Sequence, residues 1–231
     1  MPRVVKHPDA RRSELLDFAQ ALFFERGYER TTVSDIIEKA GVSKGGFYHH
    51  FASKEEMLEA LAARLAQESV ARFEDVLEAP GLGALARLNA FFARSRRMKI
   101  EDAPRLRAMF DVLFKPGNLI LHHRINAAVI PVMVPVLAAI IAQGKAEGVF
   151  DVPEPKAAAG IVLQLNGGIR DAMARAIEAE GTPAAAAALD ALESEARFLG
   201  IAMDRILGLP DGSIVAVEPG FIRAFMSARE E

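Results

Sequence analysis

Residues 31–56 (TTVSDIIEKAGVSKGGFYHHFASKEE) constrain the fold of this chain more than any other stretch. Thr32 precedes one short helical pattern and Ser43 precedes a second, and hydroxyl side chains at such positions cap helices by accepting bonds from free N–H groups. Ala40 and Gly41 stand between the two patterns, where a glycine lets the backbone turn sharply. Two short helices joined in this way predict a helix-turn-helix.

Longer helices are predicted on both sides of this unit. Asp9 can cap a preceding helix that ends at Gly27, because apolar residues recur on one face between them. Ser53 and Glu56 form a capping box, which predicts a long helix that extends to about Leu77. The residues expected to lock the helix-turn-helix together are apolar: Ile36, Ile37, Ala40, Val42 and Phe47.

The rest of the chain has helical periodicity and no convincing strand pairing. Pro, Gly and Asn cluster between the periodic segments, as they do in helix-bounding loops. The pattern predicts an all-α protein with a helix-turn-helix domain at residues 1–53 and a helical domain at 54–231. The further helices are expected at 82–98, 103–114, 119–143, 155–179 and 183–207, with a short closing helix from Phe221.

Composition narrows the class of protein. The chain has no cysteine, so disulfides and thiolate zinc sites are excluded. Its N-terminus lacks the apolar core of a secretory signal, which favours a cytoplasmic protein. Residues 125–143 are almost wholly apolar and nearly long enough to span a membrane. Because Pro131 and Pro135 fall inside this run and no second run exists, a buried, kinked helix is the favoured interpretation.

The expected outer face of the second short helix suits DNA. A serine cap and Lys44 at its start fit phosphate oxygens or a guanine edge, and Tyr48 offers a ring and a hydroxyl. Net charge gives no support, because the formal charge of the chain is −3. From spacing alone, a helical hairpin packed into a larger bundle remains an equal alternative. The outward-facing residues are Ser43, Lys44, Gly45, Tyr48 and His49.

Residues 10–56 closely resemble the DNA-binding domain of the tetracycline-repressor-like (TetR) family. The chain departs from the family pattern at Gly46, where members commonly have Thr, Ser or Ala. Two consecutive glycines cost roughly 1 kcal/mol each inside a helix, so this helix is expected to be weak alone. The matching pieces are Phe18–Ala19, Leu22–Phe23, Gly27–Tyr28, Thr31–Thr32, Ile36, Ala40–Gly45, Phe47–Phe51 and Ser53–Glu56.

The resemblance implies a dimeric transcriptional regulator, most often a repressor, that leaves a palindromic DNA operator when a small molecule binds its C-terminal domain. By motif match, Thr32, Tyr48 and Lys54 would hold phosphates. Ser43, Lys44, Gly45 and His49 would lie at or near base edges. A ligand that favours one tilt of the helix starting at Lys54 would change the spacing of the two recognition helices.

Two apolar stripes predict how copies of the chain pair. In residues 183–207, apolar side chains repeat at spacings of three and four, and residues 155–179 have a stripe of mostly small residues. Together they favour a four-helix dimer interface, although both stripes could instead face their own monomer's core. The stripes are Leu189, Leu192, Ala196, Leu199, Met203 and Ile206, and Ile161, Leu165, Gly168, Ala172 and Ala176.

A mostly apolar cavity with a few polar anchors is the expected form of an effector site, which suggests a hydrophobic ligand. The histidine pairs at 49–50 and 122–123 predict no metal site, because adjacent helical residues point about 100° apart. No cofactor is expected. An all-helical enzyme or a protein-interaction module are the competing interpretations. The expected effector-binding residues are Phe110, Phe114, His123, Asn126, Gln164 and Asn166.

Overall fold

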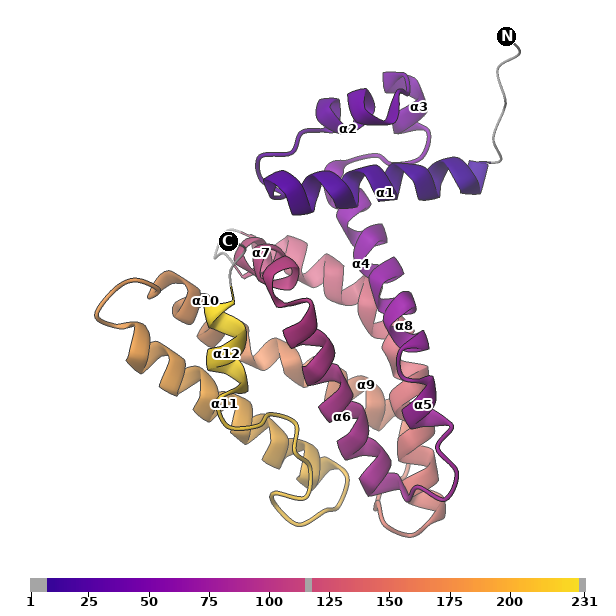
Figure 1. Ribbon diagram of the computed structural model, residues 1–231. Helices are drawn as coiled ribbons and strands as arrows, with labels where there is room; N and C mark the ends of the chain where they lie inside the picture. Colours follow the sequence, from indigo (N-terminus) through magenta and orange to yellow (C-terminus); the bar gives the residue numbers. More distant parts are fainter. Residues whose placement is uncertain (1–7, 115–117, 229–231) are drawn as a thin grey trace.

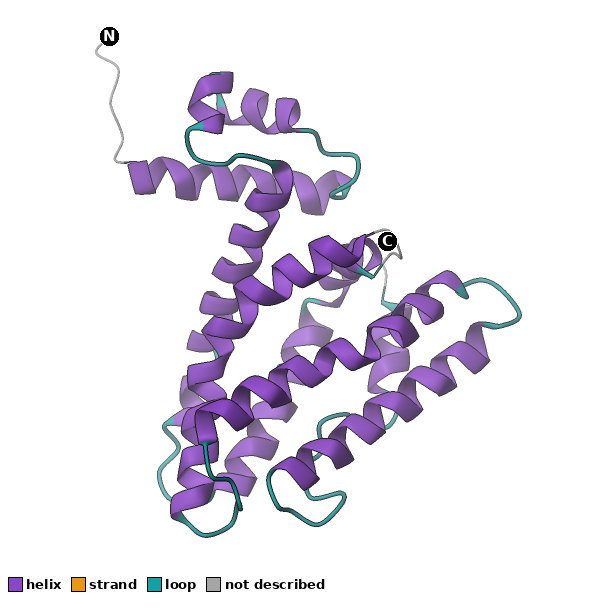
Figure 2. Ribbon diagram, turned by 180° about the vertical axis from the view of Figure 1, so that it is seen from behind, coloured by secondary structure: helices purple, strands orange, loops and turns teal. Residues whose placement is uncertain are grey.

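The computed structural model describes residues 8–114 and 118–228, and those ranges contain helices and loops but no strand (Figure 2). The N-terminal helices form a separate layer at one end of the molecule, and α4 runs from that layer into the larger helical body (Figure 1). The all-α prediction is confirmed. The first four helices are α1 (Pro8–Arg26), α2 (Val33–Ala40), α3 (Lys44–Tyr48) and α4 (Lys54–Ala71).

Local capping explains where these helices begin. Thr32 and Asp35 form a complete capping box at α2, and the Ser43 side chain accepts a bond from the backbone N–H of Gly46 at α3. Ser53 caps α4 by accepting from the N–H of Glu56. Gly41 ends α2 with a left-handed φ of 61°, a conformation that glycine adopts without steric cost. The three caps and the glycine turn predicted from the sequence are therefore confirmed.

The larger body contains the remaining helices (Figure 1). They are α5 (Glu74–Leu77), α6 (Ala84–Glu101), α7 (Ala103–Leu113), α8 (Leu119–Ala146), α9 (Pro155–Leu165), the 3-10 turn η2 (Asn166–Ile169), α10 (Arg170–Glu178), α11 (Ala185–Ile206) and α12 (Phe221–Ser227).

Two predicted helices are interrupted. The helix expected to reach Leu77 stops at Ala71, because Phe73 turns into the core and its ring centroid lies 4.5 Å from that of Phe91. The helix expected over 155–179 breaks into α9, η2 and α10 at Gly167 and Gly168. Two adjacent glycines weaken an α-helix enough for a 3-10 turn to replace it.

Buried apolar side chains form three clusters. The N-terminal cluster joins the helix-turn-helix to α4, α7 and α8, and the C-terminal cluster joins α7, α10, α11 and α12. A third cluster fills the lower body between α6, α8, α9 and α11. The N-terminal cluster comprises Leu15, Leu16, Ala19, Leu22, Phe23, Tyr28, Ile36, Phe47, Phe51, Met57, Leu58, Leu61, Ala62, Val112, Leu113, Leu121 and Ile125. The C-terminal cluster comprises Ala103, Ala172, Met173, Ala176, Leu192, Ala196, Ile222, Phe225 and Met226.

Helix α8 is the most apolar helix of the described chain. By length and composition it could cross a membrane, but it packs along α4 and α9. Only 28% of its most apolar stretch is buried in the monomer, which is less than the sequence suggested. It continues through Pro131 and Pro135, and both prolines lie on its exposed side.

Candidate nucleic-acid interface

Helix α3 lies on the surface of the N-terminal layer and is anchored by one ring. Phe47 is completely buried and packs edge to face against Tyr48, with ring centroids 5.3 Å apart. Tyr48 itself is 47% exposed. Because the anchor points inward, Ser43, Lys44 and the neighbouring residues of α3 face solvent. The short helix is thus held by Phe47 and presents its other side outward.

The glycines of α3 differ in their surroundings. A Cβ at Gly45 would meet no atom within 4 Å, whereas one at Gly46 would lie 3.3 Å from the Ser43 hydroxyl oxygen. Gly45 therefore presents open backbone on the exposed side, and Gly46 leaves room for the cap. His49 ends the helix and is exposed, with its ring 5.0 Å from that of His50.

The start of α2 already holds a carboxylate. Asp35 accepts bonds from the Thr32 N–H and from its hydroxyl, both at 2.7 Å. These bonds from Thr32 hold the pKa of Asp35 below its usual range. Thr32 remains exposed, but its hydroxyl is engaged in the cap. A phosphate at this position would have to share the N-terminus of α2 with Asp35.

The structure places Lys54 differently from the sequence expectation. Its ammonium donates to the carbonyl oxygens of Tyr28 and Thr31, both at 2.9 Å, and lies 4.1 Å from the centroid of the Tyr28 ring. Two of the three N–H donors of the ammonium are therefore engaged by carbonyl oxygens of the protein itself. Burial, with Glu55 nearby, raises the pKa of Tyr28 and keeps its phenol protonated. Lys54 therefore fastens the α1–α2 loop to the start of α4.

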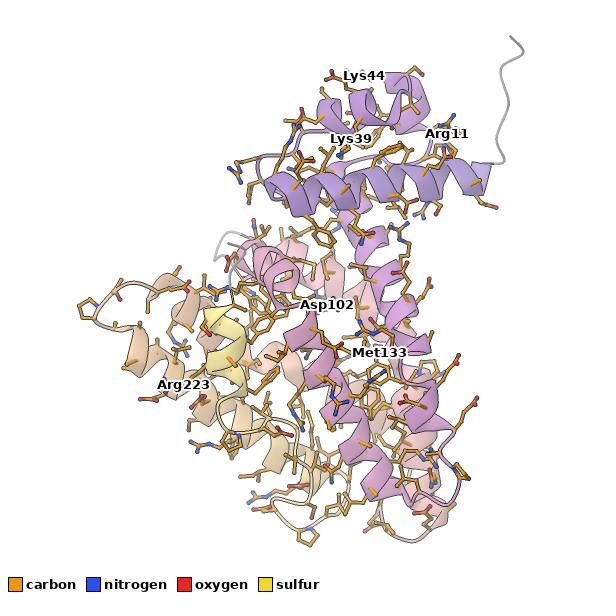
Figure 3. All side chains as sticks on the ribbon, in the orientation of Figure 1. Arg11, Lys39, Lys44, Asp102, Met133 and Arg223 are labelled. Atoms are coloured by element: carbon orange, nitrogen blue, oxygen red, sulfur yellow. The ribbon has the colours of Figure 1, made fainter. Side chains whose placement is uncertain are left out.

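Three acidic residues of α1 have basic partners. Glu14 pairs with Arg11 at 3.0 Å, Glu25 with Lys39 at 3.2 Å, and Asp17 with Arg64 at 2.6 Å. Figure 3 shows Lys39 and Lys44 on the α2–α3 side and Arg11 near the start of α1. Among the described residues, Lys44 has no ion-pair partner, so its charge is available to an external anion.

Arg12 is a basic residue near the end of α3 that was not among the predicted DNA contacts. Its guanidinium carbon lies 4.7 Å from the centroid of the Phe51 ring, a cation–π contact that holds it beside the end of α3. Burial, and then the charges of His49, Arg12 and Arg11, lower the pKa of His50. The proximity to α3 arises from tertiary packing and leaves no local sequence signal.

Four aromatic and polar side chains at the junction of α7 and α8 lie together. The ring of Phe114 is 5.2 Å from both Phe110 and His122, and Asn126 Nδ2 is 3.4 Å from His122 Nδ1. This group includes three expected effector residues, Phe110, Phe114 and Asn126. His123 and Gln164 are exposed on the monomer surface, and the side chain of Asn166 lies outside the described part.

Phe114 touches two of the buried clusters. It packs against both the N-terminal and the C-terminal cluster. Val112 and Leu113, directly before it, are buried among helix-turn-helix side chains. A shift of the Phe114 ring would therefore change the packing of both the N-terminal and the C-terminal cluster.

The predicted pairing stripes face largely inward. Leu192, Ala196 and Met203 of α11 are buried in their own monomer, and so are Ala172 and Ala176 of α10. A helical stripe looks the same whether it faces a core or a partner chain, so the sequence could not separate the two cases. The large apolar side chains that α9 and α11 expose are Ile161, at 52%, and Phe198, at 63%.

These observations define the class: a helix-turn-helix protein whose recognition helix is exposed and whose body is an all-helical domain. Two family profiles match the chain. Residues 15–61 match the bacterial regulatory proteins of the tetR family, and residues 106–174 match the tetracyclin repressor-like C-terminal domain. The chain belongs to the TetR family of bacterial regulatory proteins.

Curated relatives are similar over part of their length. The transcriptional repressor KstR2 of Mycobacterium tuberculosis is 43% identical over 95 residues, which is 41% of this chain and 47% of KstR2. The matched part thus spans about half the length of that relative.

Solved structures share the fold over most of the chain. The regulator RolR in complex with resorcinol has a TM-score of 0.61 and 18% identity, covering 97% of each chain. FadR of Thermus thermophilus with lauroyl-CoA has a TM-score of 0.56 and 23% identity, covering 83% of this chain and 94% of FadR. At such identities these likenesses establish the fold.

Proposed function

We propose that this protein is a cytoplasmic, ligand-responsive transcriptional regulator without catalytic activity. It acts as a homodimeric repressor that binds a palindromic operator and is released by a small hydrophobic effector. The observation that carries this proposal is α3 itself, which is anchored by the buried Phe47 and exposes its capped N-terminus and Lys44. The names of its relatives are those of transcription regulators.

The proposed DNA contacts follow from which groups are exposed. Lys44 supplies a charge at the start of α3, beside the N-terminal N–H groups that the Ser43 cap orients. Gly45 lets the backbone approach base edges, and Tyr48 and His49 reach from the far end of α3. Thr32 contacts a phosphate that shares the N-terminus of α2 with Asp35, and Lys54 acts by positioning the α1–α2 loop that precedes Thr32.

A dimer is required because one five-residue helix reads only one half-site. We propose that Ile161 of α9 and Phe198 of α11 lie at the centre of the interface, since both expose large apolar surface and their helices contact each other. A two-fold dimer presents its recognition helices about one DNA turn apart, ~34 Å.

The effector is proposed to act where α7 meets α8. Phe114 touches the cluster that contains the helix-turn-helix core, and the Arg124–Glu59 ion pair ties α8 to α4. A cavity of about 20 Å³ lies between α1, α4 and α7 and is lined in part by Phe23 and Met109. It leaves room for these helices to shift relative to one another. A ligand that moves Phe114 therefore tilts α1 and α4 together. A coupling free energy of roughly 1–3 kcal/mol between effector binding and operator binding, or about 5- to 150-fold in operator affinity, is enough for a switch.

In vitro selection from random duplex DNA, followed by gel shifts at fixed salt, tests the proposal. We expect an inverted-repeat sequence to be selected, and Lys44→Ala with Tyr48→Ala to weaken its binding broadly. Lys145→Ala, which removes an exposed lysine at the C-terminal end of α8, is the matched control and should leave affinity unchanged. Failure to enrich any duplex sequence would refute the proposal.

A further inference from the structure

A cleft of about 320 Å³ lies where α1 crosses α4. Its walls are one face of each helix, with Ser13 and Leu16 on α1 and Ala60 and Ala63 on α4. Figure 1 shows why there is room here, because α4 leaves the N-terminal layer steeply while the start of α1 extends beyond it. The small side chains of the two alanines keep the space between the diverging helices open. The cleft is separate from the junction of α7 and α8, since neither of those helices contributes to its lining.

Arg12 lines the cleft and is fixed in place without using its hydrogen-bond donors. Its guanidinium carbon lies 4.7 Å from the centroid of the Phe51 ring, and Phe51 is 1% exposed, so the ring is a rigid support. A guanidinium that lies over a ring keeps the N–H groups of its edge available. Within residues 8–114 and 118–228, Arg12 has no hydrogen-bond acceptor and no ion-pair partner. The protein thus holds a preorganised guanidinium at the wall of a cleft.

The other charged groups of the cleft are already engaged. Arg64 of α4 donates to the Asp17 carboxylate and to the side-chain oxygen of Gln20, both at 2.6 Å, and so ties α4 to α1. Asp9, at the start of α1, also has a partner. The positive charge that no described carboxylate compensates is therefore that of Arg12, which suits a monoanion better than a doubly charged phosphate ester. A carboxylate presents two oxygens in the geometry that a guanidinium matches.

The cleft also lies next to the recognition helix. Phe51 follows α3 in the chain and carries Arg12 on its ring. Burial, and then the charges of His49 and Arg12, lower the pKa of His50, which places Arg12 within electrostatic range of the end of α3. An anion bound to Arg12 would neutralise positive charge beside the surface proposed to meet DNA phosphates. Occupation of the cleft would therefore oppose the binding of DNA.

We propose that the cleft between α1 and α4 is a binding site for small organic carboxylates, with Arg12 as the residue that holds the carboxylate. The apolar part of the ligand lies against Leu16, Ala60 and Ala63, and Gln67 offers a further amide donor. A ligand in this site opposes operator binding directly at the recognition unit, without passing through α7 and α8. This last step rests on the proposed function, whereas the binding site itself does not.

Isothermal titration of the full-length protein with two probes of the same shape tests the site. The probes are benzoate and benzamide, its uncharged isostere, and sodium chloride keeps the ionic strength constant. We expect benzoate to bind with a Kd of about 1 mM and benzamide about tenfold more weakly, because one charge-assisted contact separates them. Equal affinities for the two probes, or no binding of benzoate up to about 10 mM, would overturn the proposal.

Two pairs of variants locate the bound probe. Arg12→Gln should remove the preference for benzoate, and Arg12→Lys should restore part of it. Arg11→Gln, which alters a neighbouring arginine that pairs with Glu14 and does not line the cleft, is the matched control. Ala63→Leu should fill the cleft and weaken both probes about fivefold, whereas Ala71→Leu, at the exposed end of α4, should leave both unchanged. If neither Arg12→Gln nor Ala63→Leu alters binding, benzoate binds elsewhere and the proposal is wrong.

Gel shifts at constant ionic strength separate this inference from the proposed function. Saturating benzoate should weaken operator binding about fivefold in the wild type and not in Arg12→Gln. If benzoate binds as expected but the protein selects no duplex DNA, the regulator proposal fails and the site stands. If the operator is bound and benzoate is not, the site proposal fails alone.

Two further results of the gel shifts would count against the inference. Benzoate that binds but leaves operator affinity unchanged would refute the coupling between the cleft and the operator. If benzoate does not bind and Arg12→Gln reduces the salt dependence of operator binding, Arg12 is a phosphate ligand and the carboxylate site is refuted.

Discussion

Lys54 offers a direct comparison between a structural role and a DNA contact. Replacing it by methionine keeps the length of the side chain but removes two charge-assisted hydrogen bonds to carbonyls and the contact with the Tyr28 ring. Such bonds contribute about 1.5–3 kcal/mol each, and an exposed cation–π contact about 0.5–1 kcal/mol. Because Lys54 is partly exposed and methionine recovers apolar packing, we expect a net loss of about 2–3 kcal/mol in unfolding free energy.

This loss is large enough to measure. In a chain of this length it corresponds to a fall in melting temperature of about 5–10 °C. Urea unfolding at fixed protein concentration is the assay, since a dimer's apparent stability depends on concentration. A change below about 0.5 kcal/mol would mean that the bonds to Tyr28 and Thr31 contribute little.

The salt dependence of operator binding then separates the two roles. Lys54→Met should lower the affinity by displacing the loop before Thr32, while the slope of log K against log salt stays unchanged. Lys44→Met should reduce that slope by about 0.9 for each phosphate that the lysine neutralises, or about 1.8 for the two copies in a dimer. An equal fall in slope for Lys54→Met would refute the positioning role and make Lys54 a phosphate ligand.

Three further predictions concern the recognition unit and the dimer. Asp35→Ala should destabilise the protein at pH 7 but much less at pH 3, as followed by urea unfolding. The bonds from Thr32 lower the pKa of Asp35, so its contribution is present above the unfolded pKa and is lost as pH falls. Gly45→Ala should stabilise the fold by about 0.5 kcal/mol yet weaken operator binding, because its Cβ is unobstructed in the monomer but faces the DNA. Ile161→Glu with Phe198→Glu should yield folded monomers in sedimentation velocity, with operator binding abolished.

Each of these predictions has a clear contrary result. An Asp35→Ala effect that is the same at both pH values would show that the carboxylate charge is unimportant. Tighter operator binding by Gly45→Ala would show that residue 45 lies away from the DNA. Gly46→Ala is the control for adding a methyl group to α3, since a Cβ at residue 46 meets the Ser43 hydroxyl instead of open solvent. If the variant with Ile161→Glu and Phe198→Glu remains dimeric, the dimer interface does not include these two residues.

Local signals were enough to predict the helix-turn-helix. The caps at Thr32, Ser43 and Ser53 and the turn at Gly41 depend on neighbours within four residues, so the sequence alone specifies them. Phe47 and Ile36 are fully buried as expected, because a helical face that must pack is visible as periodicity.

The features that sequence reasoning missed depend on distant contacts. Helix α4 ends before Phe73 because the Phe73 ring packs against Phe91, which is eighteen positions away. No residue close to Phe73 in the sequence predicts this contact. Lys54 is turned inward by the carbonyls of a loop that it does not adjoin in sequence. The break at Gly167 was visible as two adjacent glycines, but the apolar period on both sides outweighed it in the prediction.

The group of side chains where α7 meets α8 was only partly predictable for a similar reason. The sequence favoured His123, yet the residue beside Phe114 is His122, because the rotation of α8 about its axis is set by packing against α4 and α9. Phe225 is more than a hundred residues from Phe110, and no periodicity links α12 to α7.

The central claim is that α3 is presented twice, by a symmetric dimer, to successive grooves of a duplex. Because the chain has no cysteine, a single His49→Cys substitution provides one attachment point for an iron–EDTA cleavage reagent at the end of α3. On the selected operator we expect two equal clusters of strand cleavage centred about one helical turn, ~10 base pairs, apart. A single cluster, or cleavage spread evenly along the duplex, would contradict the account.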